Sequence, residues 1–159
     1  MMIWKPNVTV ATVVEQDGKF LLVEEQTTDG LRLNQPAGHL EPGETPAQGA
    51  VRETLEETAH HVELNAFLGV YLSRYRSNRT GQDVTYLRLA FIGQVTNVDA
   101  QGTLDEGIVR AVWLTPEQIR DSQAMHRSPL VWQCVQDYLS GQRQPLTSVF
   151  CHHTVIDGV

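Results

Sequence analysis

The segment from Thr45 to about Ala59 constrains the fold most strongly, because it is typical of a helix placed between segments that are typical of strands. Thr45 is the predicted N-cap, Pro46 fits the first helical position, and Gln48 stands where a capping-box partner belongs. β-branched and apolar runs predict strands at 8–14, 19–25, 31–34, 62–75, 84–92 and 108–114. A central helix among so many strands predicts an α/β sandwich with a central mixed sheet.

Turn and cap signals separate these segments. The Asp-Gly pair at 17–18 suits a tight hairpin, and the Glu-Pro-Gly-Glu stretch at 41–44 suits a type II turn. Residues 115–118 repeat the Thr-Pro cap chemistry at the start of a short helix, and a last helix is expected within 128–138. Since no repeat, low-complexity tract or linker interrupts the chain, we expect residues 1–159 to form a single domain.

Composition excludes several classes of partner. The net charge of −7 makes a general nucleic-acid or anionic-membrane partner a poor expectation. No run approaches the ~20 apolar residues of a membrane span, and residues 1–6 lack the basic and apolar pattern of a signal peptide. We therefore expect a cytoplasmic protein, a monomer by default, in which Cys134 and Cys151 are reduced thiols.

Three carboxylates mark one face of the central helix. Glu53, Glu56 and Glu57 fall within about 100° of one another on a helical projection. Hard divalent cations such as Mg²⁺ take ligands of this kind, and the alternative is an ordinary solvated face. The opposite side, predicted to face the core, carries Ala47, Val51, Leu55 and Thr58.

These carboxylates belong to a longer pattern that resembles the Nudix hydrolase family. The family's box, G-x5-E-x7-R-E-U-x-E-E-x-G-U, spans residues 38–60 and is matched at Gly38, Glu44, Arg52, Glu53, Glu56 and Glu57. The stretches 8–14, 34–41, 127–130 and 140–143 look like the NudJ-type phosphatases of that family. The resemblance covers most of residues 7–147 and implies a Nudix-type α/β/α sandwich.

The resemblance also implies a reaction and its cofactor. Family members hydrolyse a diphosphate linked to another group X, with Mg²⁺ as cofactor and Mn²⁺ as a substitute. The implied metal ligands are Glu53, Glu56, Glu57 and the carbonyl of Gly38. Glu53 would also position or deprotonate the attacking water, and Arg52 would pair with Glu44 and orient Glu53.

Other side chains are weaker candidates. Asp105 or Glu106 would supply a further metal ligand, with a solvated loop as the alternative. A small-molecule substrate could be contacted by Arg32, His39, Tyr86 and Arg88, although Tyr86 also fits the core and His39 an exposed turn. Further candidates for phosphate or base contacts are Tyr71, Arg74, Tyr75, Arg76 and Arg79.

The chain departs from the box at its end. Ala59 stands where the family has a glycine that closes the helix in a left-handed conformation, which predicts ~1 kcal/mol of strain. Thr54 and His60 replace larger apolar residues, and Leu33 stands where relatives often carry Trp. None of these departures removes a carboxylate.

The leading functional hypothesis is release of orthophosphate from nucleoside tri- and diphosphates and from hydroxymethylpyrimidine diphosphate, as the NudJ-type resemblance implies. One alternative is another Nudix pyrophosphohydrolase, which cleaves nucleoside triphosphates to monophosphate and pyrophosphate or hydrolyses ADP-ribose. The altered end of the box suggests a non-catalytic nucleotide-sensing domain as a second alternative. A third alternative, an RNA-end processor, is disfavoured by the net charge of −7.

Overall fold

The computed structural model describes residues 1–158 and contains the predicted mixed sheet between helices. Its strands are β1 (Asn7–Gln16), β2 (Lys19–Thr27), β3 (Gly30–Asn34), β4 (Ala37–His39), β5 (His60–Arg76), β6 (Asp83–Val98) and β7 (Ile108–Leu114). Its helices are α1 (Pro46–Thr58), α2 (Pro116–Asp121), η1 (Gln123–Met125), α3 (Leu130–Leu139), η2 (Leu146–Ser148) and α4 (Thr154–Asp157). Within residues 1–158, no helix is long and apolar enough to cross a membrane.

The sheet has two halves that meet at β1 and β2. In one half, β1 runs parallel to β6 and antiparallel to β4, and β5 pairs with the far side of β6. In the other half, β2 pairs antiparallel with both β3 and β7. The halves are joined by the predicted Asp-Gly hairpin, where Asp17 and Gly18 have the positive φ angles of a tight turn.

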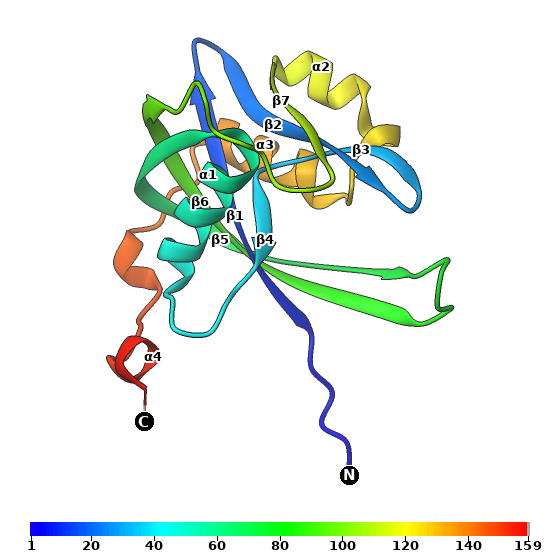
Figure 1. Ribbon diagram of the computed structural model, residues 1–159, viewed down its shortest axis with the longest axis vertical. Coiled ribbons are helices and arrows are strands. Elements are labelled where there is room, and N and C mark those ends of the chain that lie inside the picture. Colours follow the sequence, from blue (N-terminus) through cyan, green and yellow to red (C-terminus); the bar gives the residue numbers. More distant parts are fainter. Residues whose placement is uncertain (159) are drawn as a thin grey trace.

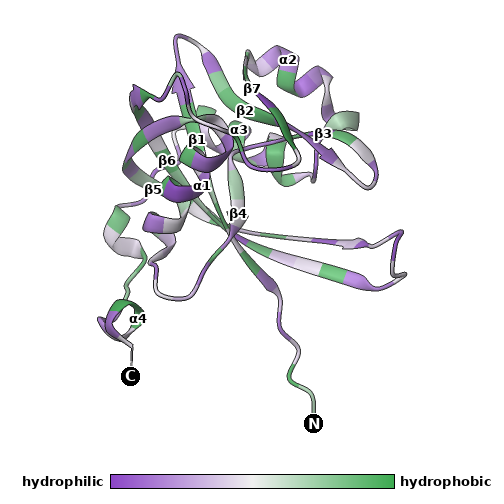
Figure 2. Cartoon of the chain, viewed as in Figure 1, coloured by the Kyte–Doolittle hydropathy of each residue, from purple (hydrophilic) through white to green (hydrophobic). Residues whose placement is uncertain are grey.

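Helices cover both faces of the sheet (Figure 1). Alternate residues of β1 point to opposite faces. Val10 therefore packs with Ala50 of α1, whereas Val13 packs with Val131 of α3. Apolar residues gather along β1, β2 and β7 in the interior (Figure 2), which is the layered core expected of a sandwich.

Helix α1 begins and ends as predicted. Thr45 accepts a hydrogen bond from the Gln48 amide, and the Gln48 side chain accepts one from the Thr45 amide. The helix ends at Ala59, which adopts the left-handed conformation with φ of 58°. The missing box glycine therefore leaves the predicted strain in place, because an L-residue with a Cβ disfavours this region.

The predicted buried face of α1 is confirmed only in part, because Thr58 is buried and Ala47 and Val51 pack against the core, but Glu53 and Glu57 are buried as well. Val51 and Leu55 are only partly buried, and the buried positions of α1 are Pro46, Gly49, Ala50, Glu53, Thr54, Glu57 and Thr58. Small side chains let the helix lie close to β1, where the hydroxyl groups of Thr54 and Thr12 hydrogen-bond at 2.9 Å. Close approach and polar pairing, rather than apolar periodicity, thus determine which side faces the sheet.

Other predictions need correction at the strand level. The strand predicted at 84–92 lies within β6, where continuous burial is confined to residues 90–93. The preceding part of β6 pairs with β5 in a two-stranded ribbon that projects from the body (Figure 1). β4 is absent from the predicted strands, and α4 lies beyond the helix expected to be the last.

The capping box makes a measurable contribution to stability. Thr45→Ala should lower the free energy of unfolding by about 1 kcal/mol, because the Gln48 amide at the start of α1 loses its acceptor. Urea unfolding followed by circular dichroism checks this. Thr103→Ala is the matched control in an exposed loop and should change stability by less than about 0.5 kcal/mol. An equal effect of both substitutions would contradict the capping role.

Candidate active site

Gly38 and Glu53 meet at the junction of β4 and α1. β4 pairs with β1, which places Gly38 opposite Val10 and beneath the helix. A Cβ at Gly38 would lie 2.1 Å from the carboxyl carbon of Glu53, closer than side chains approach in folded proteins. Only glycine therefore lets this backbone lie so close to the carboxylate.

Arg52 holds three carboxylates around this point. Its Nε and Nη2 donate to the two oxygens of Glu44 at 2.9 and 2.8 Å. Its Nη1 donates to Glu53 Oε1 at 2.8 Å and to Glu56 Oε2 at 3.0 Å, and Nη2 also donates to the His39 carbonyl. The predicted contacts of Arg52 with Glu44 and Glu53 are present, and this fork fixes where the Glu53 carboxylate lies.

Glu53, Glu56 and Asp105 form an acidic cluster, with one oxygen of each within 4.8 Å of the others. The Asp105 amide donates to the Glu56 carbonyl at 3.0 Å, which positions the loop residue against the helix. Of the two predicted distal candidates, Asp105 reaches this cluster. Glu106 is exposed and is not a member of the cluster.

Glu57 lies behind the acidic cluster. It is buried, and its Oε1 accepts a hydrogen bond from the Ala37 amide at 2.9 Å. Burial raises the pKa of Glu57 to about 8, with the charges of Glu53, Glu25 and Asp105 adding to the shift. Burial also raises the pKa of Glu53, whereas the Arg52 fork lowers the pKa of Glu44.

The donor set fits a divalent cation. The carboxylate oxygens of the acidic cluster converge where Gly38 lies against Glu53. The Arg52 guanidinium contacts the carboxylates of Glu53 and Glu56. Hard oxygen ligands of this kind suit Mg²⁺ or Mn²⁺. A bound cation would offset the repulsion and burial that raise the pKa values of Glu53 and Glu57.

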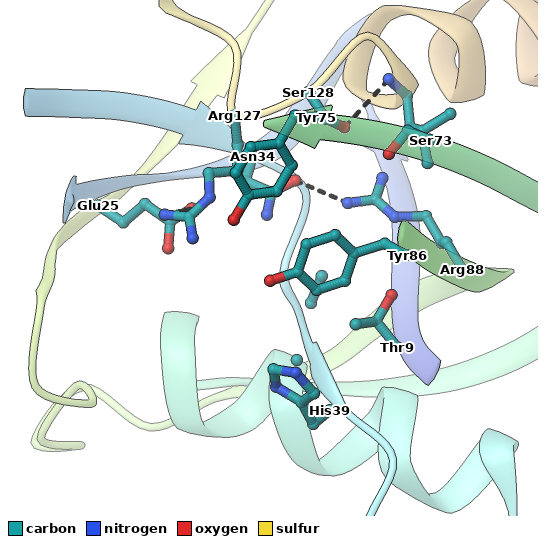
Figure 3. A pocket seen from close by; sticks show the side chains of 13 residues that line it. Thr9, Glu25, Asn34, His39, Ser73, Tyr75, Tyr86, Arg88, Arg127 and Ser128 are labelled. Atoms are coloured by element: carbon teal, nitrogen blue, oxygen red, sulfur yellow. Dashed lines mark hydrogen bonds and ion pairs between the residues drawn. The ribbon is translucent and has the colours of Figure 1, made fainter. Parts of the chain in front are cut away.

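A cavity of about 210 Å³ adjoins Gly38 and is called here the main cavity. Tyr86 lies between the rings of Tyr75 and His39, each with its centroid 6.1 Å from that of Tyr86 (Figure 3). The Tyr75 and Tyr86 rings are nearly parallel, with 5° between their planes. The other lining residues are Thr9, Glu25, Asn34, Ala37, Gly38, Ser73, Arg88, Arg127, Ser128 and Leu130.

The predicted substrate residues are distributed unevenly. His39, Tyr86 and Arg88 line the main cavity, but Arg32 lines a second cavity of about 170 Å³ instead. Arg88 is buried and donates to Gln35 and Asn34, both at 2.8 Å, so its guanidinium is already committed within the protein.

The remaining candidates divide between the core, the ribbon and the cavity. Tyr71 is buried and its hydroxyl donates to Asp137. Arg74 and Arg76 form ion pairs with Asp83 on the projecting ribbon, and exposed Arg79 lies in the loop at its tip. Tyr75 alone among these lines the main cavity.

Sequence reasoning missed Glu25, Asn34, Ser73, Arg127 and Ser128 as lining residues. A signal existed for Asn34, Arg127 and Ser128, which lie in stretches that resemble the NudJ-type enzymes. No motif marked Glu25 or Ser73, because both lie within ordinary strand patterns.

A family model for the NUDIX domain matches residues 4–133. Together with the sandwich and the intact box, this match shows that the chain belongs to the Nudix hydrolase family. Its members act on phosphorus-containing acid anhydrides, and the protein is a hydrolase of that class.

Three proteins of known name or structure are similar to this chain over most of its length. The phosphatase NudJ of Escherichia coli K12 is 36% identical over 146 residues, which are 92% of this chain and 92% of that protein. A NUDIX hydrolase from Nitrosomonas europaea is 50% identical with a TM-score of 0.85, covering 93% of this chain and 98% of its own. A UDP-X diphosphatase structure, 20% identical with a TM-score of 0.68 over 91% of this chain and 68% of its own, shares the fold.

The raised pKa of Glu57 predicts a pH-dependent stability. Without divalent cations, the free energy of unfolding should fall as pH rises from about 4.5 to about 8. In that window the folded protein binds more protons than the unfolded chain, so raising the pH favours unfolding. Glu57→Gln should flatten this dependence. Urea unfolding at about pH 5, 6 and 8 in a chelator measures the slope.

Two controls accompany this measurement. Added Mg²⁺ should restore stability at the upper end of the window, because it binds the ionised carboxylates. Glu63→Gln, at an exposed position of β5, should leave the slope unchanged. A slope that is the same in Glu57→Gln and in the unmodified protein would remove Glu57 as its source.

Proposed function

We propose that the protein hydrolyses phosphoanhydride bonds in nucleoside tri- and diphosphates and in hydroxymethylpyrimidine diphosphate, and releases orthophosphate. The observation that carries the proposal is the position of Gly38, which contacts Glu53 on one side and lines the main cavity on the other. Phosphates held near the acidic cluster would therefore leave the attached organic group in the cavity. The similarity to a phosphatase over 92% of both chains supports the choice of product.

The proposed cofactor is Mg²⁺, with Mn²⁺ as a substitute. Its proposed ligands are Glu53, Glu56, Glu57 and the Gly38 carbonyl, and Asp105 is the distal ligand that the geometry favours over Glu106. A bound cation would supply charge neutralisation on the phosphates and lower the pKa of a coordinated water.

The protein side chains orient the reaction. Arg52 donates to Oε1 of Glu53, which directs the other carboxylate oxygen toward the attacking water as a proton acceptor. Glu44 holds Arg52 through both of its oxygens and so prevents the fork from turning toward the substrate phosphates. Arg52 and Glu44 are therefore positioning residues, and Glu53 is the proposed catalytic residue.

The alternatives predict different products or none. The box binds the diphosphate and is compatible with cleavage to a nucleoside monophosphate and pyrophosphate, or with ADP-ribose hydrolysis. The acidic cluster and the Arg52 fork are complete despite Thr54, Ala59 and His60, which disfavours a non-catalytic sensing role. His60 packs against Trp113 with ring centroids 5.8 Å apart, so it fills an apolar position with an aromatic contact.

Product analysis tests the proposed reaction. The protein is incubated with Mg²⁺ in ¹⁸O-labelled water and a panel of nucleotides, hydroxymethylpyrimidine diphosphate and ADP-ribose, and products are identified by phosphorus NMR. Orthophosphate from triphosphates and diphosphates is expected, and the position of the label identifies the phosphorus attacked. Pyrophosphate without orthophosphate from a triphosphate would refute the phosphatase proposal.

Glu53→Gln tests the catalytic assignment. Turnover should fall by about 10²- to 10⁴-fold, because the amide cannot accept the proton of the attacking water. Nucleotide binding measured without divalent cations, where Glu53 does not act as a metal ligand, should weaken by less than about threefold, since the substitution is nearly isosteric. Steady-state kinetics and isothermal titration calorimetry measure the two effects, with Glu63→Gln as the exposed control. Equal losses in turnover and binding would assign Glu53 a purely structural role.

A further inference from the structure

Arg88 of β6 is a buried cation without an anionic partner. It lines the main cavity, and only 5% of its surface is exposed. Its Nη2 donates to Asn34 (Figure 3) and its Nη1 to Gln35, both at 2.8 Å, and these acceptors are uncharged amides. Among residues 1–158, no carboxylate oxygen lies within ion-pair distance of its guanidinium. A guanidinium stays charged at physiological pH, and burying that charge unpaired is costly.

The neighbours of Arg88 hold it in place without neutralising it. Gln35 is buried, and its Nε2 donates to the Val131 carbonyl at 2.8 Å, which leaves the Gln35 side-chain oxygen to face Arg88. Nη1 of Arg88 also lies 3.9 Å from Cys134 Sγ. These contacts commit the nitrogens of the guanidinium but supply no negative charge. The positive charge of Arg88 therefore acts on whatever enters the cavity.

The other charges that line the main cavity offset each other. Nη1 of Arg127 lies 3.6 Å from Glu25 Oε1, so these two side chains form an ion pair. With His39 neutral, Arg88 carries the one remaining charge among the lining side chains. The main cavity therefore presents a net positive charge, and it favours an anionic group over a neutral one.

Arg88 lies near the end of the cavity that Gly38 lines. Thr9 of β1 is paired with His39 on one side and with Arg88 on the other. Neighbouring strands are about 4.8 Å apart, so the backbone of Arg88 lies about 10 Å from the residue that follows Gly38. Gly38 also contacts Glu53 of the acidic cluster. A group bound at Gly38 would thus lie between the acidic cluster and Arg88.

We propose that the charge of Arg88 holds the inner phosphate of the substrate, the one joined to the organic group, in the main cavity near Gly38. This inference rests on the proposed function, in which the terminal phosphate lies at the acidic cluster and orthophosphate is released. The phosphate that stays on the organic group is an anion, and the carboxylates of the cluster repel it. Arg88 supplies the opposing attraction from the other side of Gly38, which makes it a positioning residue.

Arg88→Met and Arg88→Lys separate charge from structure, because both lose the bonds to Asn34 and Gln35 whereas only lysine keeps a cation. The affinity for CMP relative to cytidine, measured by calorimetry without metal, should fall about tenfold in Arg88→Met. It should fall by less than about threefold in Arg88→Lys. Arg110→Met is the matched control, since it removes an exposed arginine that pairs with Glu24, and it should leave the ratio unchanged.

Two further measurements accompany this test. With Mg²⁺, the KM for CDP should rise about tenfold in Arg88→Met while kcat changes by less than about threefold, because the inner phosphate is held equally in the substrate and in the transition state. Added KCl should weaken the binding of CMP to the unmodified protein more than that of cytidine, because salt screens the attraction. Urea unfolding establishes that both variants are folded, and the KCl measurement needs neither of them.

Each other outcome has a definite meaning. Equal losses of CMP affinity in Arg88→Met and Arg88→Lys would overturn the inference and assign Arg88 a structural role. CMP binding that strengthens with added KCl would overturn it as well. If CDP is hydrolysed despite either result, the proposed function stands without this inference. If no phosphoanhydride is cleaved but the CMP-to-cytidine ratio falls only in Arg88→Met, the proposed function fails and phosphate binding through Arg88 stands.

Discussion

The buried carboxylates of α1 are the interaction on which the rest of the site depends. Glu53 and Glu57 lie on the side of the helix that faces the sheet, where burial penalises their ionised forms. The fold compensates in part through the Arg52 fork and the Ala37 amide. The remaining excess of negative charge is what makes the site suited to a cation rather than to a substrate anion alone.

This constraint shapes the surrounding backbone. Carboxylates on the buried side of α1 require a neighbouring strand without side-chain bulk, and Gly38 of β4 provides it. The same requirement favours small and polar residues where α1 meets β1, such as Thr54, whose hydroxyl also donates to the Ala50 carbonyl at 2.7 Å. Thr54 replaces a larger apolar residue of the family box, and its hydroxyl makes hydrogen-bonded contacts at that position instead of leaving a cavity.

Local signals predicted most of the fold, whereas burial and cavities depended on contacts between distant segments. The capping box, the Asp-Gly hairpin and the left-handed Ala59 follow from short-range chemistry and are confirmed. Apolar periodicity identified only part of the buried face of α1, because Thr54 and Glu57 on that face are stabilised by partners on β1 and β4. The uncompensated charge of Arg88 could not be predicted, since it depends on the neutral partners that β3, the residue after it and α3 place around the guanidinium.

The site and the cavity are built from different parts of the chain. The acidic cluster comes from α1 and the loop before β7, and the cavity walls come mainly from β2, β5, β6 and the loop before α3. Gly38 is the common boundary, because it lies against Glu53 of the box and also lines the main cavity. This division explains why an intact box identifies the chemistry of a Nudix hydrolase but not its substrate.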